Sequence, residues 1–450
     1  MSSTNAQILR LAIPSILASI TIPLVGLVDT AIIGHISDAS AIGGIAIGTM
    51  LFDLLYWNFG FLRVGTSGMT AQAFGRQDKT ECSKLLAQSL ALSAFGTMLV
   101  WAIQWLFVTA VLACVSCSPE VEIFARKYFF IRIWAAPATL SLMTFRGWFI
   151  GMQDAMSPMI CDVIINVVNV ISSYILAIYT PLGTLGVAHG TVIAQYVGLV
   201  IATIFLLTKY KPYLQEFGHL RHVMRWSELR HLLSLNGNLF IRSLCFMIVY
   251  VGFTSIAGSY GDIELAVSSI LMKLFMLFSY FVDGFAYAGE ALVGKLFGEH
   301  DKHVDIHQRL STLLKDLFGW SIGVGVLFML VYALSGINSI SIMTDEIDVL
   351  NASRPYIPWL IAMPLVSTLA FMWDGIYIGA TAGRPIRNAM IWSALGFVVA
   401  YVALYRVWGI QALYTAYFVH LIVRVVYLSI GWKYVVRKSQ VESPQVGEHS

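Results

Sequence analysis

Charge is what this sequence has least of. Asp, Glu, Lys and Arg make up 12% of its 450 residues, about half the share found in an ordinary soluble domain. So little charge excludes a disordered chain and a nucleic-acid-binding protein, because both depend on charge content. The net charge of +3 says nothing about partners, since only the positions of the basic residues matter in such a chain.

Cysteine is also scarce, and the five residues present are too scattered for the disulfide framework of a small secreted scaffold. Cys114 and Cys117 form a C-x-x-C motif, but no second pair or paired histidines accompany them. We therefore expect ordinary thiols at a helix end, no bound metal and no cofactor. The first five residues contain no basic side chain, so the apolar stretch that follows is expected to be a retained helix and not a signal peptide.

Hydrophobic residues, by contrast, make up 58% of the chain, and the mean hydropathy is +0.76. One crossing of a bilayer takes about 20 apolar residues, so the length suits roughly a dozen crossings with short connections. Proline predicts kinks at Pro14, Pro23, Pro137 and Pro364. Twelve apolar segments can be counted, at residues 7–35, 41–74, 84–115, 124–151, 157–180, 184–208, 231–258, 264–297, 308–335, 351–380, 386–406 and 410–432.

The basic residues gather in alternate connections. They follow the second, sixth, eighth and tenth segments and fill the C-terminal tail, whereas the connections after the odd-numbered segments up to the ninth contain none. The positive-inside bias then predicts a multi-pass protein of the cell (inner) membrane with both termini in the cytoplasm. Three basic residues do not follow this pattern, because they begin segments on the side assigned as external: Arg126, Lys127 and Arg354.

The sequence contains an internal repeat. FGFLRVGTSGMTAQAFGRQDK (59–79) aligns without a gap with VDGFAYAGEALVGKLFGEHDK (282–302), at an offset close to half the length of the chain. A second alignment, of residues 126–151 with 354–379, has a slightly larger offset and matches Gly147 with Gly375. Each half holds six crossings, so the halves share one topology and are expected to be related by a pseudo-two-fold axis along the membrane normal.

These observations predict an all-α protein with twelve transmembrane helices in two pseudo-symmetric six-helix bundles. We expect an N-lobe at residues 1–208, a cytoplasmic linker at 209–230, a C-lobe at 231–435 and a cytoplasmic tail at 436–450. A two-lobed, repeated membrane protein with no soluble domain is the usual architecture of a secondary transporter.

Ionisable residues inside the membrane are candidates for function because burying a charge there is costly. Asp29 lies in IPLVGLVDTAIIGHI with no basic residue within one turn. A carboxyl group in such a place has a raised pKa, takes up a proton readily and can carry it. The bland alternative is an aspartate that caps or packs near a kink at Pro23 and Gly26.

Three further acids lie on repeat-related faces. Asp283 and Glu290 are seven residues apart and therefore on one face of a helix, and Asp53 belongs to the helix that the repeat aligns with theirs. We expect these faces to line a central cavity. Near the cytoplasmic end, however, Glu290 could instead be solvated or paired with Lys295.

The repeat also matches Asp374 with Arg146, which suggests a charge pair across the lobe interface that acts as a gate; a structural pair is the alternative. Arg63 and Lys273 are further intramembrane charges. Arg63 could neutralise Asp53, and snorkelling to the interface is the alternative for charges near helix ends.

The motifs LAIPSILASITIPLVGLVDTAIIGHI, GMTAQAFGRQD, VDGFAYAGEALVGKLFG and DGIYIGAT resemble the multidrug and toxic compound extrusion (MATE) family, in particular its DNA-damage-inducible protein F (DinF) branch. The similarity covers about residues 5 to 435. It implies two bundles of six helices, a V-shaped cavity, and export of organic compounds, often cationic and amphipathic, in exchange for protons or sodium ions.

The resemblance implies that Asp29 is the coupling carboxylate and that Asp374 matches an acid of the tenth helix. Relatives often carry a second acid on the fifth helix, where alignment through GTLGVAHGT places Ser173, with Asn169 and Thr191 as retained polar positions. A single carboxylate with few oxygens nearby favours H⁺ over Na⁺, which needs several oxygen ligands.

The sequence therefore predicts a proton-coupled antiporter that exports small organic compounds of cationic or amphipathic character, embedded in the lipid bilayer as a monomer. Sodium-coupled drug efflux and a lipid-linked precursor flippase remain alternatives. An intramembrane enzyme is disfavoured because motifs such as H-E-x-x-H and G-x-S-x-G are absent.

Overall fold

The computed structural model describes residues 3–36, 39–113, 118–215, 226–299 and 306–441. Within these ranges the side chains of residues 3, 22–36, 39–42, 226–229, 231, 306–307 and 437–441 are outside the described set. Cys114 and Cys117 lie outside the described residues, as does part of the predicted linker.

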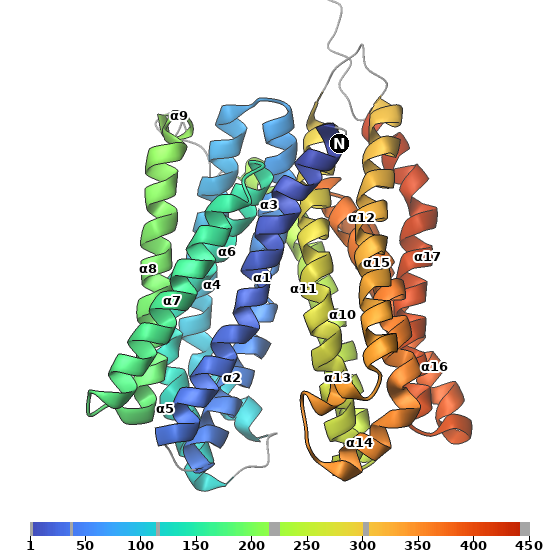
Figure 1. The fold of residues 1–450 in the computed structure, drawn as a ribbon. Helices are drawn as coiled ribbons and strands as arrows, with labels where there is room; N and C mark the ends of the chain where they lie inside the picture. The colour runs from blue at the N-terminus through green and yellow to red at the C-terminus, as the bar shows by residue number, and fades with distance from the viewer. Residues whose placement is uncertain (1–2, 37–38, 114–117, 216–225, 300–305, 442–450) are drawn as a thin grey trace, which may run out of the picture. The chain divides into compact units, whose positions relative to one another are not determined.

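The described chain is helical throughout, with no strand in the described ranges (Figure 1). The first half contains α1 (Ser3–Ile36), α2 (Ala39–Trp57), α3 (Phe61–Gly75), α4 (Lys79–Ala113), α5 (Pro119–Arg132), α6 (Ala136–Gly151), α7 (Met156–Ile178), α8 (Gly186–Lys209) and α9 (Lys211–Leu214). The second half contains α10 (Trp226–Ser259), α11 (Asp262–Gly298), α12 (Ile306–Ser335), α13 (Asn338–Ser341), α14 (Ile347–Ser353), α15 (Ile357–Gly379), α16 (Gly383–Trp408) and α17 (Gln411–Val441).

Twelve membrane spans account for nearly all of this length. Eleven spans in the described part of the chain are long and apolar enough to cross a bilayer, and α1, with 34 residues, is the twelfth. Three predicted spans are broken near the middle or the start. Asn58 and Gly60 separate α2 from α3, and the short 3-10 helices Ile133–Ala135 and Arg354–Tyr356 precede α6 and α15. Prolines explain the last two breaks, since Pro137 opens α6 and Pro355 lies in the turn before α15.

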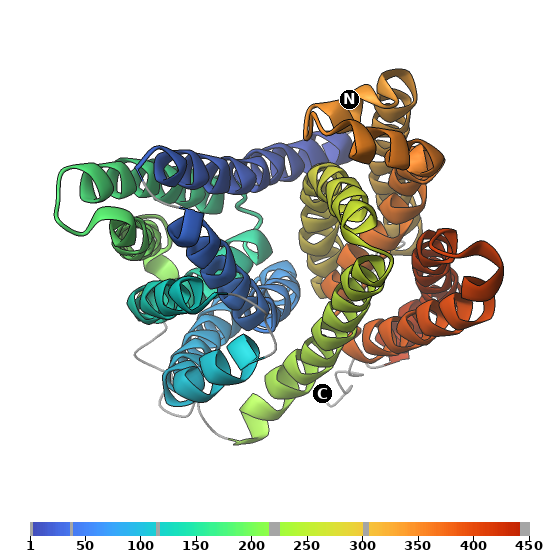
Figure 2. The same ribbon diagram turned by 90° about the horizontal axis from the view of Figure 1, so that it is seen from below.

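The chain forms two compact units. The N-unit is Ile13–Leu233, and the C-unit is Ser234–Ser450 together with Met1–Ala12. The first twelve residues, which the sequence assigns to the N-lobe, thus group with the C-unit, where Trp320 Nε1 donates a hydrogen bond to Asn5 Oδ1 at 2.9 Å. Within the units, α7 lies along α8 and α16 lies along α17 (Figure 2).

Glycines bring the same pairs of helices together in both units. A Cβ atom on Gly147 of α6 would lie 2.2 Å from the backbone oxygen of Arg63 in α3. A Cβ on Gly375 of α15 would lie 2.3 Å from the backbone oxygen of Ala286 in α11. Both contacts join residues that the two sequence alignments pair, so the repeat is a structural repeat and its two registers are correct.

The turns that follow these helices repeat as well. Gln153 and Thr381, which the second alignment pairs when it is extended, both have positive φ angles, of 62° and 52°. Gly183, between α7 and α8, and Gly409, between α16 and α17, each have a φ of 54° in the turn of the next helical hairpin, a conformation that glycine adopts without steric cost. The two units therefore share backbone detail as well as helix order.

Candidate functional site

The predicted coupling residue, Asp29, lies in α1, but its side chain is outside the described residues. The helix itself is placed by a side-chain contact two turns earlier, where Asn166 Nδ2 of α7 donates to Thr21 Oγ1 at 2.6 Å. From Ile13 onward α1 runs beside α7 in the same direction (Figure 1). At 1.5 Å per residue, Asp29 is about 12 Å beyond Thr21, and Ser173 is about 10 Å beyond Asn166. Asp29 and Ser173 thus occupy similar levels of neighbouring helices.

A neutral polar network fills this region of α7 and α8. Asn169 Nδ2 donates to Thr191 Oγ1 at 3.0 Å, and Thr191 Oγ1 donates to the Val187 carbonyl at 3.1 Å. Asn169, Ser173 and Thr191 are all buried. Gly190 permits this packing, because a Cβ there would lie 2.5 Å from Ser173 Oγ. Three sequence-predicted cavity residues are therefore brought together.

One acceptor in this network is unused. Asn169 Oδ1 is buried and has no hydrogen-bond partner among the described residues. A buried carbonyl oxygen without a partner costs about 1 to 3 kcal/mol, so a donor is expected to reach it in some state of the protein.

The C-unit holds a different kind of centre, in which two arginines face one carboxylate. Asp374 of α15 accepts from Arg424 Nε of α17 at 3.0 Å, and a second, shorter bond joins Arg424 Nη2 to the same carboxylate. Arg242 Nη1 of α10 lies 3.7 Å from Asp374 Oδ2. Asp374 is 6% exposed and Arg424 is 3% exposed, so these charges interact with little screening by water.

The predicted pair between Arg146 and Asp374 is replaced by separate pairs within the units. Arg146 Nε of α6 donates to Asp162 Oδ1 of α7 at 2.8 Å, as Asp374 pairs with its arginines in the C-unit. The repeat does place the two residues at equivalent positions, but each is neutralised by a helix of its own unit.

A basic group that acts on the Asp53 carboxylate is Arg132 at the end of α5, a residue that the sequence analysis did not connect with it. The Arg132 guanidinium also lies 4.8 Å from the Phe52 ring centroid and donates to Tyr128 Oη at 3.2 Å. The backbone oxygen of Arg63 lies in the Gly147 contact.

The acids of α11 differ in exposure. Glu290 is 1% exposed and Asp283 is partly exposed. The suggested partner of Glu290, Lys295, forms an ion pair with Glu299 at 3.8 Å. Lys273, on the same helix, is exposed, as expected for a lysine that reaches out of the apolar layer.

Comparison with known proteins identifies this arrangement. The MatE family profile matches residues 14–175 and 239–403. The chain belongs to this multidrug and toxic compound extrusion (MATE) family. It is therefore a membrane transporter of small organic compounds and not an enzyme.

Two relatives and one solved structure refine the assignment. DNA damage-inducible protein F of Escherichia coli (strain K12) is 32% identical over 433 residues, covering 96% of this chain and 93% of that protein, which places the chain in the DinF branch. The probable multidrug resistance protein NorM of Synechocystis sp. (strain ATCC 27184 / PCC 6803 / Kazusa) is 24% identical, over 74% of this chain and 71% of that one. A crystal structure of MATE in the bent conformation superposes with a TM-score of 0.83 at 18% identity, covering 98% and 96% of the two chains.

Three buried or half-buried basic residues of this MATE chain were not singled out from its sequence. Arg424 and His420 lie on α17, within the span Gln411–Val436, and Arg132 lies within Pro119–Gly151. His420 is 1% exposed. The available signal was the occurrence of a basic residue inside an apolar run, which is as informative as an acid there.

A buried carboxylate outside the spans ties the turn between α6 and α7 to the end of α8. Asp154 Oδ2 accepts from Lys209 Nζ at 2.6 Å, Tyr210 Oη at 2.7 Å and Ser157 Oγ at 2.5 Å. Burial alone raises the pKa of Asp154, but these bonds outweigh it and hold the pKa below its ordinary value. Burial, together with the same carboxylate, raises the pKa of Tyr210.

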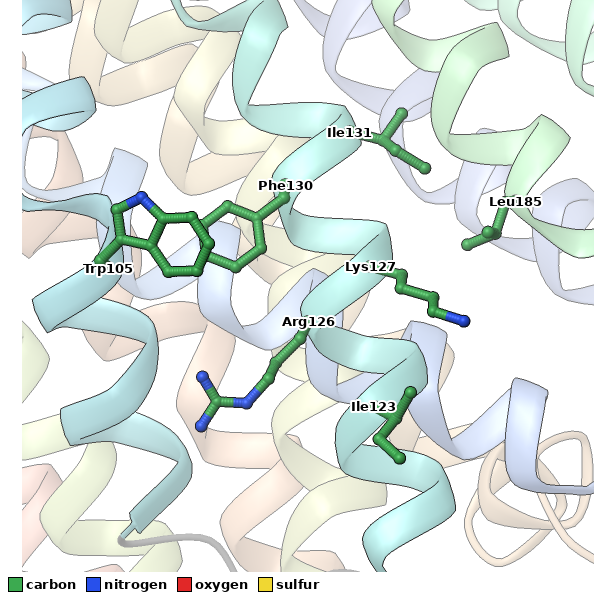
Figure 3. Close-up of a pocket in the computed structure, with 7 residues that line it drawn as sticks. All are labelled: Trp105, Ile123, Arg126, Lys127, Phe130, Ile131 and Leu185. Atoms are coloured by element: carbon green, nitrogen blue, oxygen red, sulfur yellow. The ribbon is translucent and has the colours of Figure 1, made fainter.

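The N-unit surface also carries a pocket of about 500 Å³ that is separate from these residues (Figure 3). Its walls are the exposed side chain of Trp105, which packs against Phe130 with 4.1 Å between ring centroids and the rings tilted by 34°, and the flanks of α5. Arg126 and Lys127 extend to opposite sides of α5 (Figure 3). The lining residues are Trp105, Ile123, Arg126, Lys127, Phe130, Ile131 and Leu185. None of the sequence-predicted cavity residues lines it, so this surface hollow is distinct from the polar networks.

Proposed function

We propose that this MATE transporter exports organic, amphipathic compounds in exchange for protons, with Asp29 as the coupling residue. The protein lies in the inner membrane as a monomer with both termini in the cytoplasm, in keeping with the distribution of basic residues in the connections. Sequence neighbours named for drug resistance and the two-unit architecture support the transport class.

The unused acceptor on Asn169 is the observation that carries proton coupling. Asn169 Oδ1 is a buried acceptor on α7, the helix that α1 follows through the bond between Asn166 and Thr21. A protonated carboxyl group can donate to this oxygen, whereas an ionised carboxylate cannot. Protonation of Asp29 would therefore allow a hydrogen bond that draws α1 toward α7, and deprotonation would abolish that bond.

The neutral character of the network favours H⁺ over Na⁺. The buried groups at this level are the amide of Asn169 and the hydroxyls of Ser173 and Thr191. With no second carboxylate on this part of α7, one proton suffices to neutralise Asp29. In the proposed cycle Asp29 takes up a proton from outside, α1 bends at Pro23 and Gly26, and substrate leaves the N-unit.

Reconstituted protein tests the proposal. Proteoliposomes that contain wild type, Asp29→Asn or the exposed-loop control Asp345→Asn would be given a proton gradient or a sodium gradient separately, with a fluorescent organic cation as substrate. Wild type and Asp345→Asn should accumulate dye only with the proton gradient, and Asp29→Asn should lose at least 90% of that uptake. Full uptake by Asp29→Asn, or uptake driven only by sodium, would refute the coupling scheme.

A further inference from the structure

The surface pocket beside α5 follows one face of that helix (Figure 3). Most of its lining residues recur at intervals of three and four along α5, which places them on a single face: Ile123, Arg126, Lys127, Phe130 and Ile131. Trp105 of α4 and Leu185, just before α8, complete the lining. Apart from the two basic side chains, the pocket of about 500 Å³ therefore presents apolar and aromatic surface.

The basic residues lie at the level where α5 leaves the hydrocarbon layer. The span Pro119–Gly151 has 33 residues, which is about 50 Å of helix, whereas the hydrocarbon layer is about 30 Å thick. If both ends share the excess equally, the boundary lies about seven residues from Pro119, next to Arg126. The same arithmetic for the 35 residues of Lys79–Ala113 places the boundary on α4 close to Trp105. Two neighbouring helices thus put the pocket at one membrane interface.

Polarity along the pocket has the order found in a phospholipid. Because α5 enters the apolar layer from Pro119 onward, Phe130 and Ile131 lie about 5 to 6 Å deeper than Lys127. Trp105 packs against Phe130 at this depth, and tryptophan is enriched at membrane interfaces. A phosphate group beside Lys127 would therefore leave an acyl chain lying on apolar and aromatic side chains.

Lys127 is the cation that can meet such a phosphate. Arg126 forms an ion pair with Glu122, in which Nη2 lies 2.8 Å from Oε1, so much of its charge is already compensated. The Lys127 side chain is exposed and extends to the other side of α5 (Figure 3). In the described part of the chain it forms no ion pair or hydrogen bond. Charge complementarity therefore favours an anionic lipid over a neutral one.

We propose that this pocket binds a phospholipid with an anionic headgroup, whose phosphate contacts Lys127 and whose acyl chain lies on Phe130, Ile131 and Trp105. A zwitterionic phospholipid could cover the same apolar surface but would gain less from the lysine, since its own cation offsets its phosphate. Such a lipid explains why Lys127 does not follow the positive-inside pattern, because the headgroup supplies the opposite charge. The site is independent of the proposed proton exchange.

Two lipids that differ only in their headgroups provide the test. The full chain would be reconstituted into phosphatidylcholine vesicles that contain increasing fractions of brominated phosphatidylglycerol or brominated phosphatidylcholine. Bromine on the acyl chains quenches tryptophan fluorescence only at close range, so the quenching that is lost in Trp105→Phe reports on lipid in this pocket. Wild type should bind phosphatidylglycerol there roughly fivefold more tightly than phosphatidylcholine, the effect of one lysine near anionic lipid.

Variants of the basic residues locate this preference, each made with and without Trp105→Phe. Lys127→Gln should bring the affinity ratio close to one, whereas Lys127→Arg should keep it. Arg354→Gln is the matched control and should behave as wild type. The repeat aligns Arg354 with Arg126, the side chain is also exposed, and Pro355 stands in the place of Lys127. Unchanged quenching by phosphatidylcholine and an unchanged gel-filtration profile show that a variant is folded.

Equal affinity of wild type for the two lipids would overturn the inference, as would an unchanged ratio in Lys127→Gln. A preference that falls as much in Arg354→Gln would show attraction of anionic lipid to any surface charge and would also overturn it. Absence of any quenching that depends on Trp105 would mean that lipid does not enter the pocket.

Discussion

The two units have the same backbone contacts and opposite charges at equivalent positions. Gly147 meets Arg63 in the N-unit as Gly375 meets Ala286 in the C-unit. One residue before each glycine, however, stands Arg146 in the N-unit and Asp374 in the C-unit. The repeated helix packing therefore determines the position of a buried charge but not its sign. Neighbouring helices supply the opposite charge, which is Asp162 in the N-unit and two arginines in the C-unit.

The polar residues next to these pairs differ in kind as well. The N-unit network consists of neutral amides and hydroxyls around Asn169, while the C-unit cluster is charged and buried around Arg424. The two units thus differ in the character of their buried polar groups, which are neutral around Asn169 and charged around Asp374.

Removing the C-unit carboxylate should have the largest effect on stability. Asp374→Asn leaves a buried arginine uncompensated, which costs about 3 to 5 kcal/mol. The matching N-unit change, Asp162→Asn, should cost clearly less, because the Arg146 side chain is 31% exposed whereas Arg424 is 3% exposed. Chemical or thermal unfolding of the two variants measures this difference. The double variant D374N/R424Q should recover part of the loss, and equal losses for the two single variants would remove the proposed contrast in burial.

Filling the glycine contacts should have a similar effect in both units. Gly147→Ala and Gly375→Ala each force a Cβ into a backbone oxygen, and overpacking of this kind costs about 1 to 3 kcal/mol or more. Gly323→Ala in α12 is the matched control, since a Cβ there meets no atom within 4 Å. Thermal melts of the purified variants would test the pair. A loss of stability in only one of the two variants would show that the helix contacts of the two units are less alike than their geometry indicates.

The stability contributed by the turn after α6 should depend on pH, whereas that of the equivalent turn in the C-unit should not. Asp154 aligns with Ala382 when the second alignment is extended, so only the N-unit turn has a carboxylate. Because the pKa of Asp154 is lowered, its contribution is fully present above the ordinary value near 3.9 and is lost as the pH falls through the folded-state value. Asp154→Asn should therefore lower stability by roughly 1 to 2 kcal/mol at neutral pH.

That deficit should shrink below about pH 4, where wild type also loses its carboxylate. Melting temperatures of wild type, Asp154→Asn and Asp345→Asn between pH 3 and pH 7 would show it. A deficit that stays constant across this range would mean that the ionised form of Asp154 contributes nothing.

The smallest expected effect concerns Gln153 and Thr381, the two repeat-paired residues with positive φ that follow α6 and α15. A β-branched side chain is strained in this conformation, so Thr381→Gly should raise stability, by about 1 kcal/mol or less after the entropy cost of glycine. Gln153→Gly should gain less, since glutamine is not branched at Cβ. Differential scanning fluorimetry would resolve the order. A fall in melting temperature for Thr381→Gly would show that its side-chain contacts outweigh the strain.

Much of the helix arrangement can be predicted from the sequence, because membrane spans and repeats are local sequence patterns. Apolar runs gave the twelve spans, and the repeat alignment paired Gly147 with Gly375, which the structure then shows in equivalent helix contacts. The breaks inside spans were partly foreseen, since Pro137 marks one of them. The break at Asn58 and Gly60 was not, because neither residue excludes a continuous helix.

Partners of buried charges were harder to predict. Asp374 was recognised as an intramembrane charge, but its partner, Arg424, lies on α17 beyond the whole of α16, and pattern analysis does not show which faces of distant helices meet. The same reason explains why Arg132 of α5 was not connected with Asp53 of α2. Sequence symmetry suggested that Arg146 and Asp374 would meet, yet equivalent positions in a repeat do not have to be in contact.

The glycine contacts have one more consequence. Where the backbone of α6 touches that of α3, and α15 touches α11, a Cβ already has no room, and a file of water molecules needs far more space than a Cβ. A transporter driven by an ion gradient wastes its energy source if ions cross without cargo. Substitutions that force these helices apart are therefore expected to let ions leak through the protein before they stop transport.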